Sequence, residues 1–253
     1  MKRRPARCPA HRLAAVRQAE HPHGVALPQS SQSQGTVVWL FDLDDTLHSA
    51  SQASLPHISA AMNDYIEHHL GLGPADAQTL RRQHWQRYGA TLLGLVRHNG
   101  VNATHFLHHT HVLPGLEARV RGHRADIAAL RALPGRKFIL TNAPVAYALR
   151  VLRALGITRL FDGVLCIEDM HMFGQLRPKP DARMLRAVAV KLRVPARRCV
   201  LVEDTLVHQK AARSIGMHTV WMQRWLSHGG TRRHRRPAYV GQRIKNLREL
   251  LKR

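Results

Sequence analysis

The sequence has few cysteines and no apolar segment of the kind that enters or crosses a membrane. Cys8, Cys166 and Cys199 are its only cysteines, an odd number in 253 residues, which favours reduced thiols over a disulfide framework. Residues 1–35 mix Arg, His, Gln, Ser and Pro without a stretch long enough for an export signal or a membrane span. We therefore expect a cytoplasmic protein with no membrane partner and a disordered basic tail over 1–35.

Acidic residues are also scarce. There are 16 Asp and Glu against 39 Lys and Arg, a formal net charge of +23. Such an excess can indicate binding to nucleic acid. Much of it is expected outside the core, in 1–35 and 232–236, and the rest is scattered. Nucleic-acid binding is therefore kept only as an alternative, and a positive field that draws anionic phosphate esters is favoured. The sequence does not indicate an oligomeric state.

An apolar run, residues 37–41, leads directly into two acids, Asp42 and Asp44. A continuously apolar run bounded by polar residues is typical of a strand buried on both faces, as in a parallel sheet. Ligand sites in such sheets lie beyond the carboxyl ends of the strands. Because side chains alternate along a strand, both carboxylates can point to one side. Their spacing predicts a divalent metal, an acid and nucleophile pair, or both.

Three later segments belong with this pair. Residues 137–142 form a second apolar run ending in Thr141 and Asn142, and Lys179 stands between two prolines before a helical stretch. Residues 199–205 form a third apolar run that ends in Glu203 and Asp204. Each segment alone has an ordinary structural explanation, such as a helix cap or a solvated loop charge. In this order they form one set of parts for phosphoryl transfer.

With these motifs, the sequence from about 36 to 226 resembles the haloacid dehalogenase superfamily of phosphatases. The resemblance implies that Asp42 is the nucleophile and Asp44 the general acid and base. It implies that Thr141, Asn142 and Lys179 bind the phosphoryl group. It also implies Mg²⁺ as cofactor, and the predicted metal site comprises Asp42, Asp44, Glu203 and Asp204.

The residues themselves support this chemistry. A cation held by carboxylates offsets the repulsion between an anionic nucleophile and an anionic phosphate, and Lys179 adds a further positive charge. Attack by Asp42 would give an aspartyl-phosphate, which splits one difficult step into two. Asp44 could protonate the leaving oxygen and later deprotonate water. A halide leaving group needs no proton, so an acid at position 44 argues against a dehalogenase.

The order of predicted elements indicates an α/β fold, a doubly wound Rossmann-like parallel sheet with an inserted all-helical cap. Strands are expected at 136–141, 163–167, 199–203 and 218–222, alternating with helices at 124–133, 144–155, 181–192 and 206–215. A closing strand at 239–240 and a helix at 244–252 are expected to follow. The predicted domains are a core of 36–49 and 122–253 and a cap of 50–121, whose apolar residues recur at helical spacing.

Residues 88–97 in the cap are similar to a stretch in pyrimidine 5'-nucleotidase-like members of the superfamily. This implies that Tyr88 stacks on a base and Arg97 contacts a carbonyl or phosphate. The predicted function is therefore a Mg²⁺-dependent phosphatase acting on a small phosphorylated substrate, a nucleoside monophosphate. Alternatives are a sugar-phosphate phosphatase, a phosphomutase, or a basic nucleic-acid-associated protein.

Two histidines stand where relatives often carry other residues, and a further group of histidines lies within one short segment. His208 stands where relatives often have Asn or Asp, and His48 where an aromatic is frequent, which leaves the support of the metal site open. Residues 105–111 contain four histidines. Histidine is a common zinc ligand, but no Cys or acid completes the set in this stretch, so a solvated helix face is expected.

Overall fold

The computed structural model describes residues 37–225 and 236–252. The predicted tail over 1–35 and most of the basic segment 232–236 lie outside the described residues. The part that is described contains a six-stranded sheet in the order β3-β2-β1-β6-β7-β8, with every neighbouring pair parallel. This is the predicted α/β fold.

The strands of the sheet are short, and the two central strands are buried along their whole length. They run over Val38–Phe41 (β1), Arg136–Leu140 (β2), Gly163–Leu165 (β3), Cys199–Glu203 (β6), His218–Met222 (β7) and Gln242–Ile244 (β8). All four residues of β1 and all five of β6 are buried. Strands covered on both faces must be apolar throughout, which explains why these runs do not alternate with polar residues.

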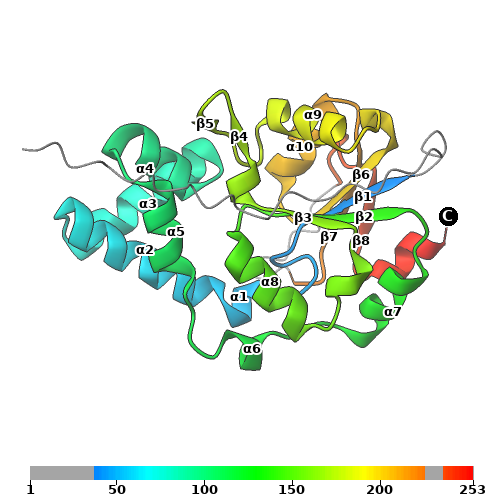
Figure 1. Ribbon diagram of the computed structural model, residues 1–253, viewed down its shortest axis with the longest axis horizontal. Coiled ribbons are helices and arrows are strands. Elements are labelled where there is room, and N and C mark those ends of the chain that lie inside the picture. The colour runs from blue at the N-terminus through cyan, green and yellow to red at the C-terminus, as the bar shows by residue number, and fades with distance from the viewer. Residues whose placement is uncertain (1–36, 226–235, 253) are drawn as a thin grey trace, which may run out of the picture. The chain divides into compact units, whose positions relative to one another are not determined.

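Helices cover both faces of the sheet (Figure 1). The helices α7 (Arg124–Ala132) and α8 (Val145–Ala154) lie on one face, and α9 (Ala182–Lys191) and α10 (Leu206–Ser214) on the other. Alternate residues of β1 enter the two cores: Trp39 and Phe41 pack with the α7–α8 side, and Val38 and Leu40 with the α9–α10 side. The doubly wound arrangement therefore follows from the two-residue period of the strand.

Between β1 and α7 the chain forms six helices, here called the helical insert. They are α1 (Ala50–Ala53), α2 (Leu55–Leu70), α3 (Pro74–Tyr88), α4 (Thr91–Asn99), α5 (Ala103–His111) and α6 (Leu116–Arg119). The insert has its own apolar cluster, with Ile66, Leu95 and Phe106 fully or nearly fully buried. Gly89, in the left-handed conformation, ends α3, and a Cβ there would lie 2.6 Å from Pro180. The insert therefore meets the Lys179 loop closely at a glycine.

Two local expectations were wrong, and one element was not foreseen. The closing strand is β8 rather than 239–240, and the final helical segment is a short 3₁₀ helix, Leu247–Leu251. A small antiparallel hairpin, β4 (His171–Met172) and β5 (Gln175–Leu176), was not expected. Short segments of two or three residues carry too little periodicity to be recognised, and their pairing depends on neighbouring strands.

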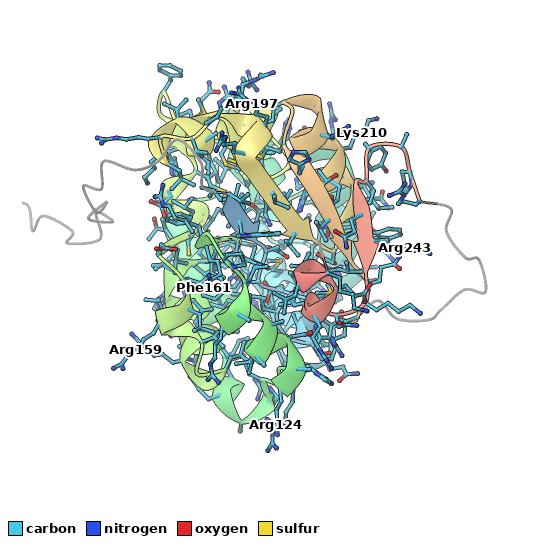
Figure 2. All side chains as sticks on the ribbon, turned by 90° about the vertical axis from the view of Figure 1, so that its right-hand side faces the viewer. Arg124, Arg159, Phe161, Arg197, Lys210 and Arg243 are labelled. Carbon is cyan, nitrogen blue, oxygen red and sulfur yellow. The ribbon has the colours of Figure 1, made fainter. Side chains whose placement is uncertain are left out.

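Most of the net positive charge belongs to the residues that the structure describes. The described residues hold 29 Lys and Arg against 15 Asp and Glu. Figure 2 shows Arg124, Arg159, Arg197, Lys210 and Arg243 on one side of the fold. No helix of the described residues is both long enough and apolar enough to cross a bilayer.

Candidate active site

The predicted site residues gather at the carboxyl edge of three adjacent strands. β1 lies between β2 and β6, so Asp42, Thr141 and the pair Glu203 and Asp204 follow strand ends that are neighbours in the sheet. The amide of Asp42 donates to the carbonyl of Val202 at 2.9 Å, which continues the β1–β6 register to Asp42, the predicted nucleophile. Parallel pairing therefore joins motifs that are 99 to 162 residues apart in the chain.

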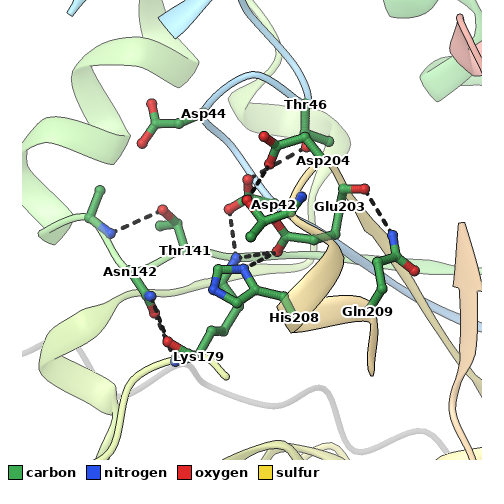
Figure 3. A network of polar contacts seen from close by, with 12 residues as sticks. Asp42, Asp44, Thr46, Thr141, Asn142, Lys179, Glu203, Asp204, His208 and Gln209 are labelled. Atoms are coloured by element: carbon green, nitrogen blue, oxygen red, sulfur yellow. Dashed lines mark hydrogen bonds and ion pairs between the residues drawn. The ribbon is translucent and has the colours of Figure 1, made fainter. Parts of the chain in front are cut away.

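Lys179 is the centre of the polar network (Figure 3). Its Nζ lies 2.7 Å from Oδ1 of Asp42 and 2.7 Å from Oε2 of Glu203, and its side chain is only 1% exposed. The loop that carries Lys179 is held by Asn142, whose side-chain amide donates to the Lys179 carbonyl and accepts from the Lys179 amide. Asn142 therefore positions the lysine, and its side chain is already bonded rather than free for a phosphate.

Burial makes the charges of this network depend on one another. Burial and the Glu203 charge raise the pKa of Asp42, although Lys179 opposes this shift. The same two causes, burial and the Glu203 charge, raise the pKa of Asp204. Against the effect of burial, Lys179 lowers the pKa of Glu203, and the two acids raise the pKa of Lys179. One lysine thus leaves the buried carboxylates of Asp42 and Glu203 and the partly buried carboxylate of Asp204 short of positive charge.

The donor set fits a hard divalent cation. Carboxylate oxygens of Asp42, Glu203 and Asp204 lie within 4.8 Å of one another. Oxygen donors of this kind suit Mg²⁺, and a dication would relieve the shortage of positive charge. Glu203 already contacts Lys179 and His208, so Asp42 and Asp204 are the carboxylates with oxygens available. The carboxylate of Asp44 lies outside this group (Figure 3).

Asp44 is instead bonded on the α8 side of the site. Its Oδ1 accepts a hydrogen bond from the Tyr147 hydroxyl at 2.6 Å and lies 3.0 Å from Nε2 of His48. Against the effect of burial, these two contacts lower the pKa of Asp44. The Tyr147 hydroxyl also contacts Oγ of Ser54, 2.7 Å away, at the junction of α1 and α2. The acid is thus linked to the first turn of the insert.

The carboxylates of Asp42 and Asp44 contact different partners, and a backbone turn at Asp45 follows directly after them. Asp45 has a φ of +53°, a conformation in which Asp is tolerated better than most residues. Its carboxylate accepts hydrogen bonds from the amide and the hydroxyl of Ser51, which closes the turn. The Thr46 hydroxyl then lies 3.5 Å from Oδ2 of Asp42. The two oxygens of Asp42 thus have different partners, Lys179 and Thr46.

The two unusual histidines both contact predicted site acids. His208 Nδ1 lies 3.0 Å from Oε2 of Glu203, and His48 contacts Asp44 as described above. Gln209 donates from its side chain to the carbonyls of Glu203 and Val220, which ties β6 to β7. His208 therefore supports Glu203. The histidine at this position, where relatives often have Asn or Asp, is thus part of the polar network.

A cavity of about 440 Å³ opens beside these residues and extends under the insert. Asp42, Asp44, Thr141, Lys179 and Asp204 line one end. The insert contributes an apolar wall of Leu55, Ile58, Met62, Leu92, Phe106 and Leu107, together with the side chains of Ser59, Arg81, Trp85, Thr91 and His111. Burial lowers the pKa of His111 to about 4, although Asp44 opposes the shift, so this wall residue is neutral near pH 7.

The two predicted substrate residues lie elsewhere. Tyr88 and Arg97 are absent from the cavity lining, and the guanidinium of Arg97 stacks over the Tyr88 ring at 5.5 Å. Sequence reasoning missed Arg81, Trp85 and Tyr147. A Trp or Arg in a polar helix, or a Tyr in an amphipathic one, resembles any surface or core residue. Only the tertiary packing distinguishes them: that of the insert beside the site for Arg81 and Trp85, and that of α8 beside Asp44 for Tyr147.

Comparisons with known proteins agree with this geometry. Residues 38–216 match the family of haloacid dehalogenase-like hydrolases. Phosphate metabolism protein 8 of Saccharomyces cerevisiae is 23% identical over 192 residues, which are 71% of this chain and 59% of that protein. The chain thus spans less than two thirds of the length of this curated relative.

Solved structures share the fold at low identity. The chain is similar to a HAD phosphatase from Thermococcus onnurineus, with a TM-score of 0.57 at 19% identity, and to CbbY from Rhodobacter sphaeroides in complex with phosphate, with 0.56 at 19%. A 2-haloacid dehalogenase from Pseudomonas syringae gives 0.52 at 21%. Each match covers 85% of this chain and 96% of the other. Both chemistries thus occur on this fold, and the choice between them depends on the residues of the site.

Proposed function

The chain belongs to the haloacid dehalogenase-like hydrolase family, and we propose that it is a magnesium-dependent phosphatase for small phosphate monoesters. The observation that carries the proposal is the contact of Lys179 with both Asp42 and Glu203, at the edge where Thr141 and Asp204 also lie. A cation and a hydroxyl beside a carboxylate nucleophile are suited to an anionic phosphoryl group.

In the first step, an oxygen of Asp42 forms a bond to phosphorus while the bond from phosphorus to the ester oxygen breaks. Asp44 donates its proton to that leaving oxygen. In the second step, the oxygen of a water molecule forms a bond to phosphorus while the bond from phosphorus to the Asp42 oxygen breaks, Asp44 accepts the water proton, and inorganic phosphate leaves. Lys179 and Thr141 hold the phosphoryl oxygens in both steps. The negative charge of an arriving phosphate raises the pKa of nearby Asp44 and so favours the protonated form that the first step needs.

The cofactor we propose is Mg²⁺, held by Asp42 and Asp204, with Glu203 behind them. When bound, the ion supplies positive charge that offsets repulsion between the nucleophile and the phosphate. Glu203 keeps Lys179 oriented, and Trp221 donates from Nε1 to the Asp204 carbonyl at 2.7 Å, which fixes the strand end. Predicted coordination by the Asp44 side chain is not retained in the proposal, because Tyr147 and His48 engage it on the other side.

The position of Asp44, which contacts Tyr147 and His48, also favours a phosphatase over a dehalogenase. A halide ion leaves without a proton, whereas an alkoxide leaving group needs one. Asp44 lines the cavity, and its side chain is 22% exposed, so it can meet a substrate oxygen there. Its positioning by Tyr147 and His48 is expected of a proton donor and has no use in halide release.

We propose a nucleoside monophosphate as the substrate, in keeping with the 5'-nucleotidase-like resemblance but with different contact residues. Arg81 and Trp85 are one helical turn apart on α3, and both line the cavity. Trp85 is 57% exposed and can stack on a planar base. Arg81 bonds Asn63 through Nε and forms no ion pair among the described residues, so its other nitrogens can contact a base carbonyl.

The insert is proposed to act as a cap over the site, since its side chains form most of the cavity wall opposite the carboxylates. We also propose that the enzyme works in the cytoplasm. Cys166 and Cys199, the two cysteines within the described part, are free and buried, as expected where thiols stay reduced.

The test is a phosphate-release screen of the purified full chain with Mg²⁺. The panel contains nucleoside monophosphates, sugar phosphates, glycerol phosphate and chloroacetate. We expect phosphate release with the highest kcat/KM for a nucleoside monophosphate and no chloride release. Absence of phosphate release from every ester would reject the proposal. Tight oligonucleotide binding at physiological salt would then favour a nucleic-acid role, and isomerised sugar phosphate without free phosphate would indicate a mutase.

A further inference from the structure

Three imidazoles form a cluster on the helical insert, outside the cavity described above. His105 and His109 are one turn apart on α5, and His69 lies in the last turn of α2. Their ring centres are 4.2 Å (His105–His109), 5.1 Å (His69–His105) and 5.9 Å (His69–His109) apart. All three residues are exposed, and none lines the cavity that holds the carboxylates. Phosphoryl transfer therefore does not account for them.

We propose that His69, His105 and His109 bind a transition-metal dication of the Zn²⁺ class. Three imidazoles bound to one tetrahedral ion, each nitrogen about 2.0 Å from it, have ring centres roughly 5 Å apart. The three observed separations lie on both sides of that value. Imidazole nitrogen suits Zn²⁺, Ni²⁺ and Cu²⁺ and not Mg²⁺, so the site is chemically distinct from the carboxylate cluster.

Tyr65 orients two of the three rings. His105 Nδ1 contacts the Tyr65 hydroxyl at 2.9 Å, and His69 Nδ1 contacts the Tyr65 carbonyl oxygen at 3.1 Å. The His69 ring also stacks on the Tyr65 ring at 3.9 Å. A bonded Nδ1 leaves Nε2 of each histidine for an ion, and such a hydrogen bond raises the basicity of the ligating nitrogen.

His109 completes the set by a change of side-chain rotamer. Among the described residues, only Asp42, Glu203 and Asp204 already have ligand atoms that all lie within 4.8 Å, so at least one imidazole must turn to bind. The His109 ring forms no hydrogen bond within that part of the chain and is exposed, which leaves it free to turn.

The surroundings provide room for an ion and a fourth ligand. A cavity of about 230 Å³ lies beside the rings, lined by Asp64, Tyr65, His68, His69 and His109. Water or the Asp64 carboxylate can take the remaining position of a tetrahedral ion. A bound ion would join α2 to α5, the helices that supply Ile58, Met62, Phe106 and His111 to the substrate cavity. Binding to the folded form would then raise the Tm.

The experiment titrates Zn²⁺ into the full chain, free of any affinity tag, with excess Mg²⁺ present to occupy the carboxylate cluster. Calorimetry measures the number of ions bound, and thermal unfolding measures the change in Tm. The test variant is H69A/H105A/H109A. The matched control is H57A/H171A/H218A, which removes three exposed histidines outside the cluster.

We expect the test variant to lose one equivalent of Zn²⁺ and the Zn²⁺-dependent rise in Tm, while the control retains both. The single variant His109→Ala serves if the triple variant folds poorly, as judged by circular dichroism, because His109 contributes no hydrogen bond. It should weaken Zn²⁺ binding at least tenfold. Equal stoichiometry and affinity in wild type and in the cluster variants would overturn the proposal.

Discussion

The Tyr147 hydroxyl donates to Oδ1 of Asp44 at 2.6 Å, across 103 positions of the chain. Asp44 follows β1, whereas Tyr147 lies in α8, the helix after β2. Burial and the charge of Asp44 raise the pKa of Tyr147, so the hydroxyl keeps its proton and remains a donor throughout the physiological range. Asp44, the proposed proton donor and acceptor, is therefore oriented by a neutral hydroxyl on α8. Its orientation does not depend only on the loop after β1 in which Asp44 lies.

Removal of this donor should affect turnover more than substrate binding. In Tyr147→Phe, the Asp44 carboxyl group loses one of the two contacts that orient it. Because misplacement of a reacting group can cost about 10²-fold in rate, kcat should fall by roughly 10–100-fold. KM should stay within about twofold. Steady-state phosphate release measures both. Tyr239→Phe, which removes a hydroxyl outside the cavity, should match wild type, and a Tyr147→Phe enzyme of unchanged kcat would show that the contact is structural only.

The two aspartates should fail in different ways. Asp42→Asn is expected to abolish turnover, because an amide neither attacks phosphorus nor carries the charge that Lys179 pairs with. Asp44→Asn should still form the aspartyl-phosphate from a substrate with a good leaving group, such as 4-nitrophenyl phosphate, and stall on esters of ordinary alcohols. Burst kinetics with both substrates separates these cases. Wild-type turnover by Asp42→Asn would refute the covalent mechanism.

Metal removal should inactivate the enzyme reversibly. EDTA is expected to remove activity and added Mg²⁺ to restore it, since one lysine does not balance the three clustered carboxylates. Asp204→Asn should raise the Mg²⁺ concentration for half-maximal activity by at least roughly tenfold. Asp169→Asn, which changes an acid outside the cavity lining, is the matched control. Full activity after EDTA treatment would exclude the proposed metal site.

Arg81 and Trp85 should determine which ester is preferred. Trp85→Ala should lower kcat/KM for nucleoside monophosphates by about 10–100-fold, because stacking on a base contributes about 1–3 kcal/mol. Glycerol phosphate, which has no planar group, should be hydrolysed as before. Trp85→Phe should recover most of the loss, and Arg82→Ala, one position along α3 but outside the cavity lining, should resemble wild type. An equal loss for both esters would mean that Trp85 acts on the fold.

The contribution of the first turn of α9 to the free energy of unfolding should depend on the charge of Asp181. Against the effect of partial burial, Arg183 and Arg177 lower the pKa of Asp181 to about 2, and its carboxylate caps the helix by accepting from the Arg183 amide. A lowered pKa means that this contribution is present above the unfolded pKa of 3.8 and is lost as pH falls toward about 2.

Two variants separate the cap from the charge. Asp181→Asn keeps a good cap and loses the ion pairs, so its deficit in unfolding free energy should vanish between pH 4 and 2. Asp181→Ala should keep a remaining deficit of about 1 kcal/mol at low pH, from the lost cap. Urea unfolding at pH 7, 4 and 2.5 measures both. A pH-independent deficit in Asp181→Asn would contradict the assigned ion pairs.

By itself, the sequence determined the sheet and the positions of the main carboxylates. Apolar runs ending in polar residues identify β1, β2 and β6, and parallel strands bring their carboxyl ends to one edge. Asp42, Thr141 and Asp204 were predicted for this reason, Lys179 was predicted from its loop between two prolines, and all four line one cavity. That information is local, because each residue is placed by the strand or loop that immediately surrounds it.

Only the tertiary structure decided which side chains complete these sites. Tyr147 reaches Asp44 because α8 packs beside the turn after β1, and Trp85 reaches the cavity because α3 lies over the sheet edge. His69 joins His105 because α2 packs on α5. The orientation of one helix against another depends on the packing of many side chains together. No short segment of sequence contains that information. For this reason Tyr88 and Arg97 were predicted, whereas Arg81 and Trp85 line the cavity.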